Sequence, residues 1–140
     1  MDKIGYRAAV ILAHVFAAAG LVCMGTLPFV LPPYAGITVS VVLYAIGGGL
    51  TEVVISPIVE ACPGSAKSAA MSLLHSFYCW GCVAVVLVST LLFRVLGMEN
   101  WRWVSLGWAV VPLVNIAYFA LVPINTLVDD DERIPVWRLF

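Results

Sequence analysis

The sequence of 140 residues is 63% hydrophobic and only 11% charged, with a formal net charge of −1. Soluble domains carry about 25% charged residues, so this composition excludes an ordinary soluble domain. It also excludes a nucleic-acid-binding domain, because no basic stripe is present that could contact phosphates. Long apolar runs must form helices or closed barrels in lipid, and these runs lack the alternation typical of barrel strands. We therefore predict an all-α integral membrane protein.

Charged or Pro- and Gly-rich positions divide the chain into four apolar spans, which are the predicted transmembrane helices. They are expected near residues 8–30, 36–59, 69–93 and 103–124, between a short start (1–7) and a polar tail (125–140). Because the connections are short, neighbouring helices must run antiparallel. The acidic run at 129–132 is interpreted as part of a solvated loop, because no further ligands accompany it that would make a cation site.

The Lys and Arg residues are distributed unequally between the two ends of the spans. One end carries Lys3, Arg7, Lys67, Arg133 and Arg138, whereas the other carries Arg94 and Arg102. Positive residues favour the cytoplasmic side. Both termini are therefore predicted to be cytoplasmic, in a multi-pass protein of the cell inner membrane or plasma membrane. Trp101 and Trp103 beside Arg102 are typical of an aromatic belt at the outer interface.

Glu52 is the most informative ionisable residue inside a predicted span. A carboxylate at this depth costs roughly 2.5–3.5 kcal/mol to insert, by analogy with Asp at a helix centre. Carboxylates inside membranes almost always face a bundle interior or an aqueous cavity, and many handle protons or substrates. We therefore expect Glu52 to face a cavity and to take part in proton or substrate handling. The alternative is an interhelical hydrogen bond that only stabilises the bundle.

Polar and small side chains recur every four residues on the same predicted helix. This stripe consists of Ser40, Tyr44, Gly48, Glu52 and Ser56. Side chains four residues apart share one helix face, so the stripe predicts a face that lines a cavity or contacts another helix. The run Gly47-Gly48-Gly49 predicts close approach of a neighbouring helix, with a hinge as the alternative.

The third span also carries its polar residues at spacings of three and four, which places them on one face. They are Ser68, Ser72, His75, Cys79 and Cys82. We interpret His75 as a cavity-facing hydrogen-bond donor, with interhelical packing as the alternative. His14, in the first span, has fewer polar neighbours, so a structural role is expected there.

Sites for metals or catalysis are not indicated. Cys79 and Cys82 form a C-x-x-C pattern near His75, but no fourth ligand is evident, so we predict packing residues and no metal site. The sequence contains no nucleophile elbow, phosphate loop, zinc-protease pattern or paired aspartates. We therefore predict that the protein is not an enzyme and needs no cofactor.

The start of the chain resembles the major facilitator superfamily of transporters. Asp2-Lys3-Ile4-Gly5-Tyr6-Arg7 is similar to the D-R-x-G-[RY]-[RK] part of the signature loop between the second and third helices of that family. Lys3 departs from the usual Arg. The resemblance assigns Asp2, Gly5 and Arg7 to this conformational signature loop.

A second segment is similar to the fourth and fifth helices of the fucose-permease-like branch of the superfamily. It comprises Gly47-Gly48-Gly49-Leu50-Thr51-Glu52, Pro57, Ala70-Met71-Ser72-Leu73-Leu74-His75-Ser76-Phe77 and Gly81. In that branch a membrane carboxylate precedes a proline by five positions, and the next helix opens with L-x-x-x-Q/H-x-F-x-x-x-G. The resemblance implies proton coupling for Glu52 and a cavity-facing position for His75. Ser56 stands where Asn is common.

The resemblance further implies that the four spans are helices three to six of a twelve-helix carrier, within its N-terminal six-helix half. Residues 125–140 would begin the central cytoplasmic loop. The expected function is proton-coupled uptake of a sugar or similar small polar solute by alternating access, with His75, Tyr44 and Ser56 binding the solute. The expected partners are the lipid bilayer, the proton, the solute and the missing helices of the same transporter.

Other readings of the four spans stay open. The chain could be a small four-helix protein with a structural or assembly role, or a half-size transporter that oligomerises. A heavy-metal carrier that uses His75, Cys79 and Cys82 is a further alternative. Sequencing the flanking DNA separates a fragment from a small protein, because further in-frame spans are expected only for the fragment.

Overall fold

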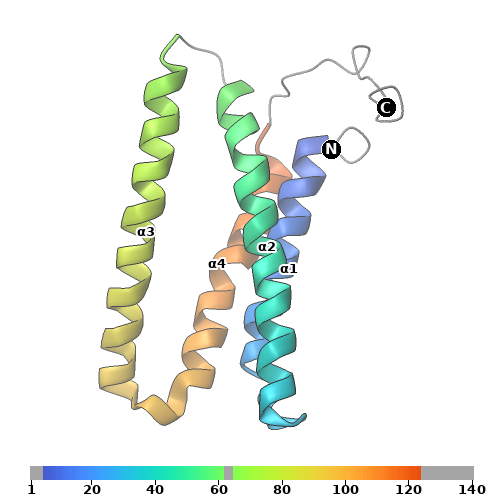
Figure 1. Cartoon of the computed structure of the whole chain (residues 1–140), viewed down its shortest axis with the longest axis vertical. Helices are drawn as coiled ribbons and strands as arrows, with labels where there is room; N and C mark the ends of the chain where they lie inside the picture. The colour runs from blue at the N-terminus through green and yellow to red at the C-terminus, as the bar shows by residue number, and fades with distance from the viewer. Residues whose placement is uncertain (1–4, 62–64, 124–140) are drawn as a thin grey trace.

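The computed structural model describes residues 5–61 and 65–123, which form helices and no strand. The four long helices are α1 (Gly5–Met24), α2 (Pro33–Ala61), α3 (Lys67–Leu96) and α4 (Trp101–Leu121), and they run antiparallel in chain order (Figure 1). Two short 3₁₀ helices, η1 (Leu27–Phe29) and η2 (Met98–Asn100), precede α2 and α4.

All four long helices have the length and composition needed to cross a membrane. With their flanking turns they measure 25, 29, 30 and 24 residues, whereas a helix needs about 20 apolar residues to span the hydrocarbon core. The predicted all-helical class is thus confirmed, and the four helices are consistent with a multi-pass membrane protein. Their place in a larger transporter bundle stays a prediction.

Small residues allow the backbones of α1 and α2 to meet closely. A Cβ atom at the buried Gly47 would lie 2.5 Å from the backbone nitrogen of Ala17, and one at Gly20 would lie 2.5 Å from the backbone nitrogen of Tyr44. Only glycine fits such contacts. The expected close approach is therefore correct for Gly47. It is wrong for Gly48 and Gly49, where an added Cβ would meet nothing within 4 Å.

Hydrogen bonds attach α4 to both ends of α1. The Ser105 hydroxyl donates to the carbonyl oxygen of Leu21 over 2.8 Å. At the opposite end, the Arg7 guanidinium donates to the carbonyl oxygens of Ala120 (3.4 Å) and Val122 (2.9 Å). The last carbonyl groups of a helix have no donor within that helix. Arg7 thus satisfies the end of α4 and brings the start of α1 beside it.

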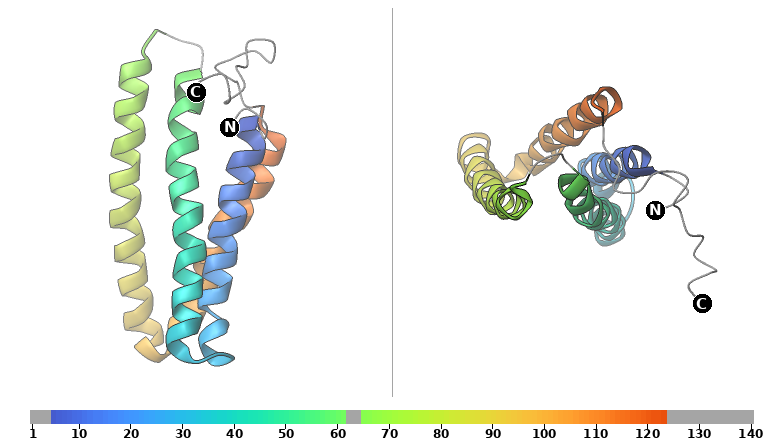
Figure 2. Two further views of the ribbon diagram at one scale, coloured as in Figure 1. Left: turned by 45° about the vertical axis from the view of Figure 1, so that its right-hand side comes forward. Right: turned by 90° about the horizontal axis from the view of Figure 1, so that it is seen from above.

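Helix α3 stands apart from the other three helices, and its ribbon is separate in both views of Figure 2. None of its 30 residues is buried. A hydrogen bond from the Trp108 indole nitrogen to the Ser89 hydroxyl oxygen, 2.9 Å long, links α3 to α4. The exposed side chains of α3 are largely apolar, including Phe77, Trp80 and Leu91, as suits contact with lipid.

Candidate functional site

A cavity of about 690 Å³ lies between α3 and the other three helices, and all four helices contribute to its wall. Its polar lining consists of His14, Tyr44, Thr51, Glu52, Ser56, His75, Tyr78, Ser89, Trp108 and Asn115. Ligand pockets in proteins commonly measure about 300–1,000 Å³. The cavity is therefore large enough for a small polar solute.

The structure brings the residues predicted for proton coupling and solute binding to this one cavity. Tyr44, Glu52 and Ser56 line it from α2, and His75 lines it from α3. Their spacings of eight and four residues on α2 place the three side chains on the same face of that helix. Their roles in transport stay predictions.

Glu52 and His75 lie at similar depths along the bundle. Glu52 is nine residues before the last residue of α2, and His75 is eight residues after the first residue of α3. At 1.5 Å per residue, these positions are about 14 Å and about 12 Å from the ends of their helices. Those two ends lie at the same end of the bundle (Figure 1). Tyr44 lies about 12 Å farther along α2, so the polar wall extends toward the other end.

The charge in the cavity wall comes from Glu52. Glu52 is the single acidic side chain in the lining, which contains neither Lys nor Arg. Within residues 5–61 and 65–123, Glu52 forms no hydrogen bond or ion pair. Its carboxyl group is therefore available to exchange a proton or to bind a solute hydroxyl group. When ionised, it would repel an anionic solute, because no cation in the lining compensates the charge.

His14 and Asn115 form a second polar group in the cavity wall. The Nδ1 atom of His14 is 2.8 Å from the carbonyl oxygen of Val10, and the Nδ2 atom of Asn115 is 3.3 Å from Nε2 of His14. The Phe119 ring packs against the imidazole, with 5.4 Å between ring centroids. Asn115 is thus a polar partner of His14 that the sequence did not indicate, and the structural role expected for His14 stays a prediction. Asn115 comes from α4, 101 residues away, so no sequence spacing indicates this pair.

The cavity also contains residues that the sequence analysis did not select. Tyr78 lies three residues after His75, so helical spacing alone could have placed it on the same face. Trp108 and Ser89 line the far part of the cavity and bond to each other. Their pairing depends on the packing of α3 against α4, which the spacing within one helix does not show.

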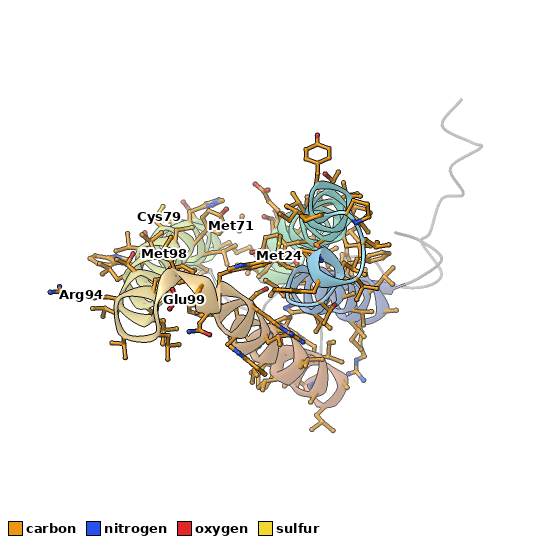
Figure 3. All side chains as sticks on the ribbon, turned by 90° about the horizontal axis from the view of Figure 1, so that it is seen from below. Met24, Met71, Cys79, Arg94, Met98 and Glu99 are labelled. Carbon is orange, nitrogen blue, oxygen red and sulfur yellow. The ribbon has the colours of Figure 1, made fainter. Side chains whose placement is uncertain are left out.

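Some residues of the two predicted polar faces do not reach the cavity. Ser40 is fully buried and donates its hydroxyl hydrogen to the carbonyl oxygen of Gly36 over 2.7 Å. Cys79 and Cys82 are exposed and are not part of the lining. Figure 3 shows Cys79 on the side of α3 away from α4. In the part of the chain that the structure describes, no three His, Cys, Asp or Glu side chains come together, so His75, Cys79 and Cys82 do not form a metal site.

Only part of the predicted signature loop lies within the described residues. Asp2 lies outside the described residues. Gly5 begins α1 with a positive φ of 73°, which favours glycine. Arg7 contacts the end of α4, as described above, rather than the cavity.

The cavity and its lining thus provide the structural basis for inferring a function. Comparison of the chain with protein-family models, with curated proteins and with solved structures found no match in any of the three.

Proposed function

We propose that these four helices belong to a proton-coupled secondary transporter of the major facilitator superfamily, in its fucose-permease-like branch. The transporter takes up a sugar or similar small polar solute by alternating access. The observation that carries this proposal is the position of Glu52, a carboxyl group without a described partner in the wall of a cavity between membrane-length helices. Tyr44, Ser56 and His75 share that wall.

Protonation of Glu52 controls closure of the cavity in this mechanism. An ionised carboxylate is costly to remove from water, so it keeps the cavity hydrated and open. A neutral carboxylic acid can be enclosed at lower cost. Tyr44, Ser56 and His75 supply hydrogen bonds to the hydroxyl groups of the solute. Since alternating access requires two halves that move against each other, transport is expected of the larger protein that contains these helices.

The test is uptake of candidate solutes by cells that express the full transporter with Glu52→Gln. This substitution keeps the shape of the side chain but removes the exchangeable proton. Uptake driven by a pH gradient should be abolished, while solute exchange or binding continues. Glu60→Gln is the matched control, because Glu60 lies on the same helix but outside the cavity lining. Unaltered coupled uptake by the Glu52→Gln protein rejects the proposed role.

A second candidate is a small four-helix membrane protein with a structural or assembly role, or a half-size transporter that oligomerises. None of the residues of α3 is buried and its exposed side chains are largely apolar, so this helix offers a surface that either lipid or a further membrane helix can cover, as an assembly role requires. Immunoblotting of the endogenous protein separates the candidates by size. A band with the mass of a twelve-helix protein supports the transporter, whereas a band with the mass of this four-helix chain supports the small protein.

A further inference from the structure

A cluster of aromatic rings surrounds Arg102 at the end of the bundle opposite to Arg7. The central guanidinium carbon of Arg102 is 5.0 Å from the ring centroid of Phe29 and 5.5 Å from that of Trp103. Phe29 in turn stacks on Trp101, with 5.6 Å between centroids and 19° between planes. The cation is thus in contact with aromatic rings from two separate parts of the chain.

The end of α1 packs closely against the start of α4, and this packing brings the rings of the cluster together. A Cβ atom at Gly25 would lie 2.8 Å from the Leu106 side chain and 3.2 Å from the carbonyl oxygen of Arg102. Gly25 therefore lets the chain pass close to the first turns of α4, and η1 then brings Phe29 beside Trp101. The rings lie at the end of two membrane-length segments, which is the level of lipid headgroups.

Arg102 has no counter-charge in the part of the chain that the structure describes. Its side chain is half-buried, and it forms no hydrogen bond or ion pair with a residue in 5–61 or 65–123. Its Nε atom is fully buried and lacks a hydrogen-bond partner. A cation that is partly removed from water is costly unless an anion compensates it. The terminal nitrogens of the guanidinium are the groups left to bind such an anion.

We propose that Arg102, with Phe29, Trp101 and Trp103, binds the phosphate of an anionic phospholipid headgroup. A guanidinium presents two parallel N–H groups that match two phosphate oxygens. Trp rings favour the headgroup level because they have an apolar body and a polar N–H group. This site is separate from the cavity, so it does not depend on the proposed transport function.

Arg94 provides a matched control at the same end of the bundle. It lies in the last turn of α3 and is exposed. Figure 3 shows that its side chain extends away from the other helices. The cation–π pairs found in the described residues involve Arg102 and not Arg94. If simple charge attraction explained lipid binding, Arg94 and Arg102 would contribute equally.

The experiment is native mass spectrometry of the whole chain in a mild non-ionic detergent, titrated with phosphatidylglycerol or phosphatidylcholine. Arg102→Gln should weaken phosphatidylglycerol binding roughly fivefold, in line with one basic residue at a membrane surface. Arg94→Gln should bind as the wild type does. Arg102→Lys keeps the charge but loses the paired N–H groups, so its binding should be intermediate. Binding of phosphatidylcholine should be weaker in the wild type and should change little.

Three results would overturn the proposal. The first is unchanged phosphatidylglycerol binding by Arg102→Gln, and the second is an equal loss in Arg94→Gln. The third is displacement of the lipid by inorganic phosphate, which would identify free phosphate as the ligand. Circular dichroism checks the helix content of each variant. If Arg102→Gln does not fold, the comparison of Arg102→Lys with the wild type decides, and equal affinities reject the site.

Discussion

Asn115 on α4 donates a hydrogen bond from Nδ2 to Nε2 of His14 on α1, across 3.3 Å in the wall of the cavity. The other ring nitrogen of His14 fixes the direction of this bond. Nδ1 is 2.8 Å from the carbonyl oxygen of Val10, and because a carbonyl group can only accept, Nδ1 must carry the proton. In the neutral imidazole Nε2 is then the acceptor. The Asn115 amide therefore presents its nitrogen to His14, and its oxygen has no hydrogen-bond donor among the described residues.

A double-mutant cycle should measure this pair. His14→Leu and Asn115→Leu should each destabilise the bundle, and the two losses should not add, because the second substitution removes a partner that is already lost. The expected coupling is about 0.6 kcal/mol and at most about 1.7 kcal/mol, the range found for hydrogen bonds between membrane helices. Unfolding in mixed detergent and SDS micelles gives the free energies.

Ser76→Ala is the control for this cycle, because within residues 5–61 and 65–123 the Ser76 hydroxyl bonds only inside its own helix, to the Ser72 carbonyl oxygen. Combined with His14→Leu it should show additive losses. A His14–Asn115 coupling close to zero would mean that the two side chains do not bond in the membrane.

Gly47→Ala should destabilise the contact between α1 and α2. The added methyl group would lie 2.5 Å from the backbone nitrogen of Ala17 and 2.7 Å from the carbonyl oxygen of Ala13. Backbone atoms cannot move aside as a flexible side chain can, so the helices must separate. We expect a loss of about 1–3 kcal/mol in the free energy of unfolding, as for other overpacked sites.

Gly49→Ala is the matched control, two residues farther along α2. Its methyl group would meet no atom within 4 Å, so the stability should change little or increase slightly, as alanine favours helix more than glycine does. Equal losses at both positions would contradict close packing at Gly47.

The sequence predicts the helices well but places their ends less well. The second span is predicted to begin at 36 and the third to end at 93, whereas α2 begins at Pro33 and α3 continues to Leu96. Proline fits the first turn of a helix, so apolar content alone sets the start of α2 too late. Arg94 interrupts the apolar run without ending the helix, because its long side chain can reach the headgroups. The helix ends at Leu96, and the following residue, Gly97, has a φ of +86° that favours glycine.

For the site, the sequence predicts which residues of one helix share a face, but it does not predict which residues of two different helices make contact. The spacing of four residues correctly groups Tyr44, Glu52 and Ser56 on one wall of the cavity. Ser40 belongs to the same four-residue repeat but is fully buried, because burial also depends on the segment of the protein that packs against the helix. The His14–Asn115 pair joins residues 101 positions apart, and such contacts follow only from the packing of α1 against α4.

Ser56→Cys should react with a membrane-impermeant thiol reagent more readily than Val53→Cys if water enters the cavity. Ser56 lines the cavity, whereas Val53 is 62% exposed on a different face of α2 and is outside the lining. Thiol reagents of this kind act on the thiolate, which forms in water and not in hydrocarbon. The rates are measured in proteoliposomes after the native cysteines are replaced by Ser.

Ser56→Cys should therefore be modified at least several times faster than Val53→Cys. If the proposed transport function is right, an excess of the solute should slow the reaction. Similar rates at both positions would indicate that the cavity is closed to water or filled by another part of the protein.

Arg7→Gln should loosen the end of α4. The Arg7 guanidinium donates to the carbonyl oxygens of Ala120 and Val122, and its charge also favours the negative end of the helix dipole, an effect of about 0.3–1 kcal/mol. Without it, amide hydrogen exchange in the last turn of α4 should accelerate by roughly two- to fivefold, as this energy range implies. Exchange in the first turn of α4 should stay unchanged. Arg94→Gln is the control, because it removes a cation from the opposite end of the bundle, and it should leave the last turn of α4 protected. If Arg7→Gln also leaves that turn protected, the hydrogen bonds of Arg7 do not stabilise the end of α4.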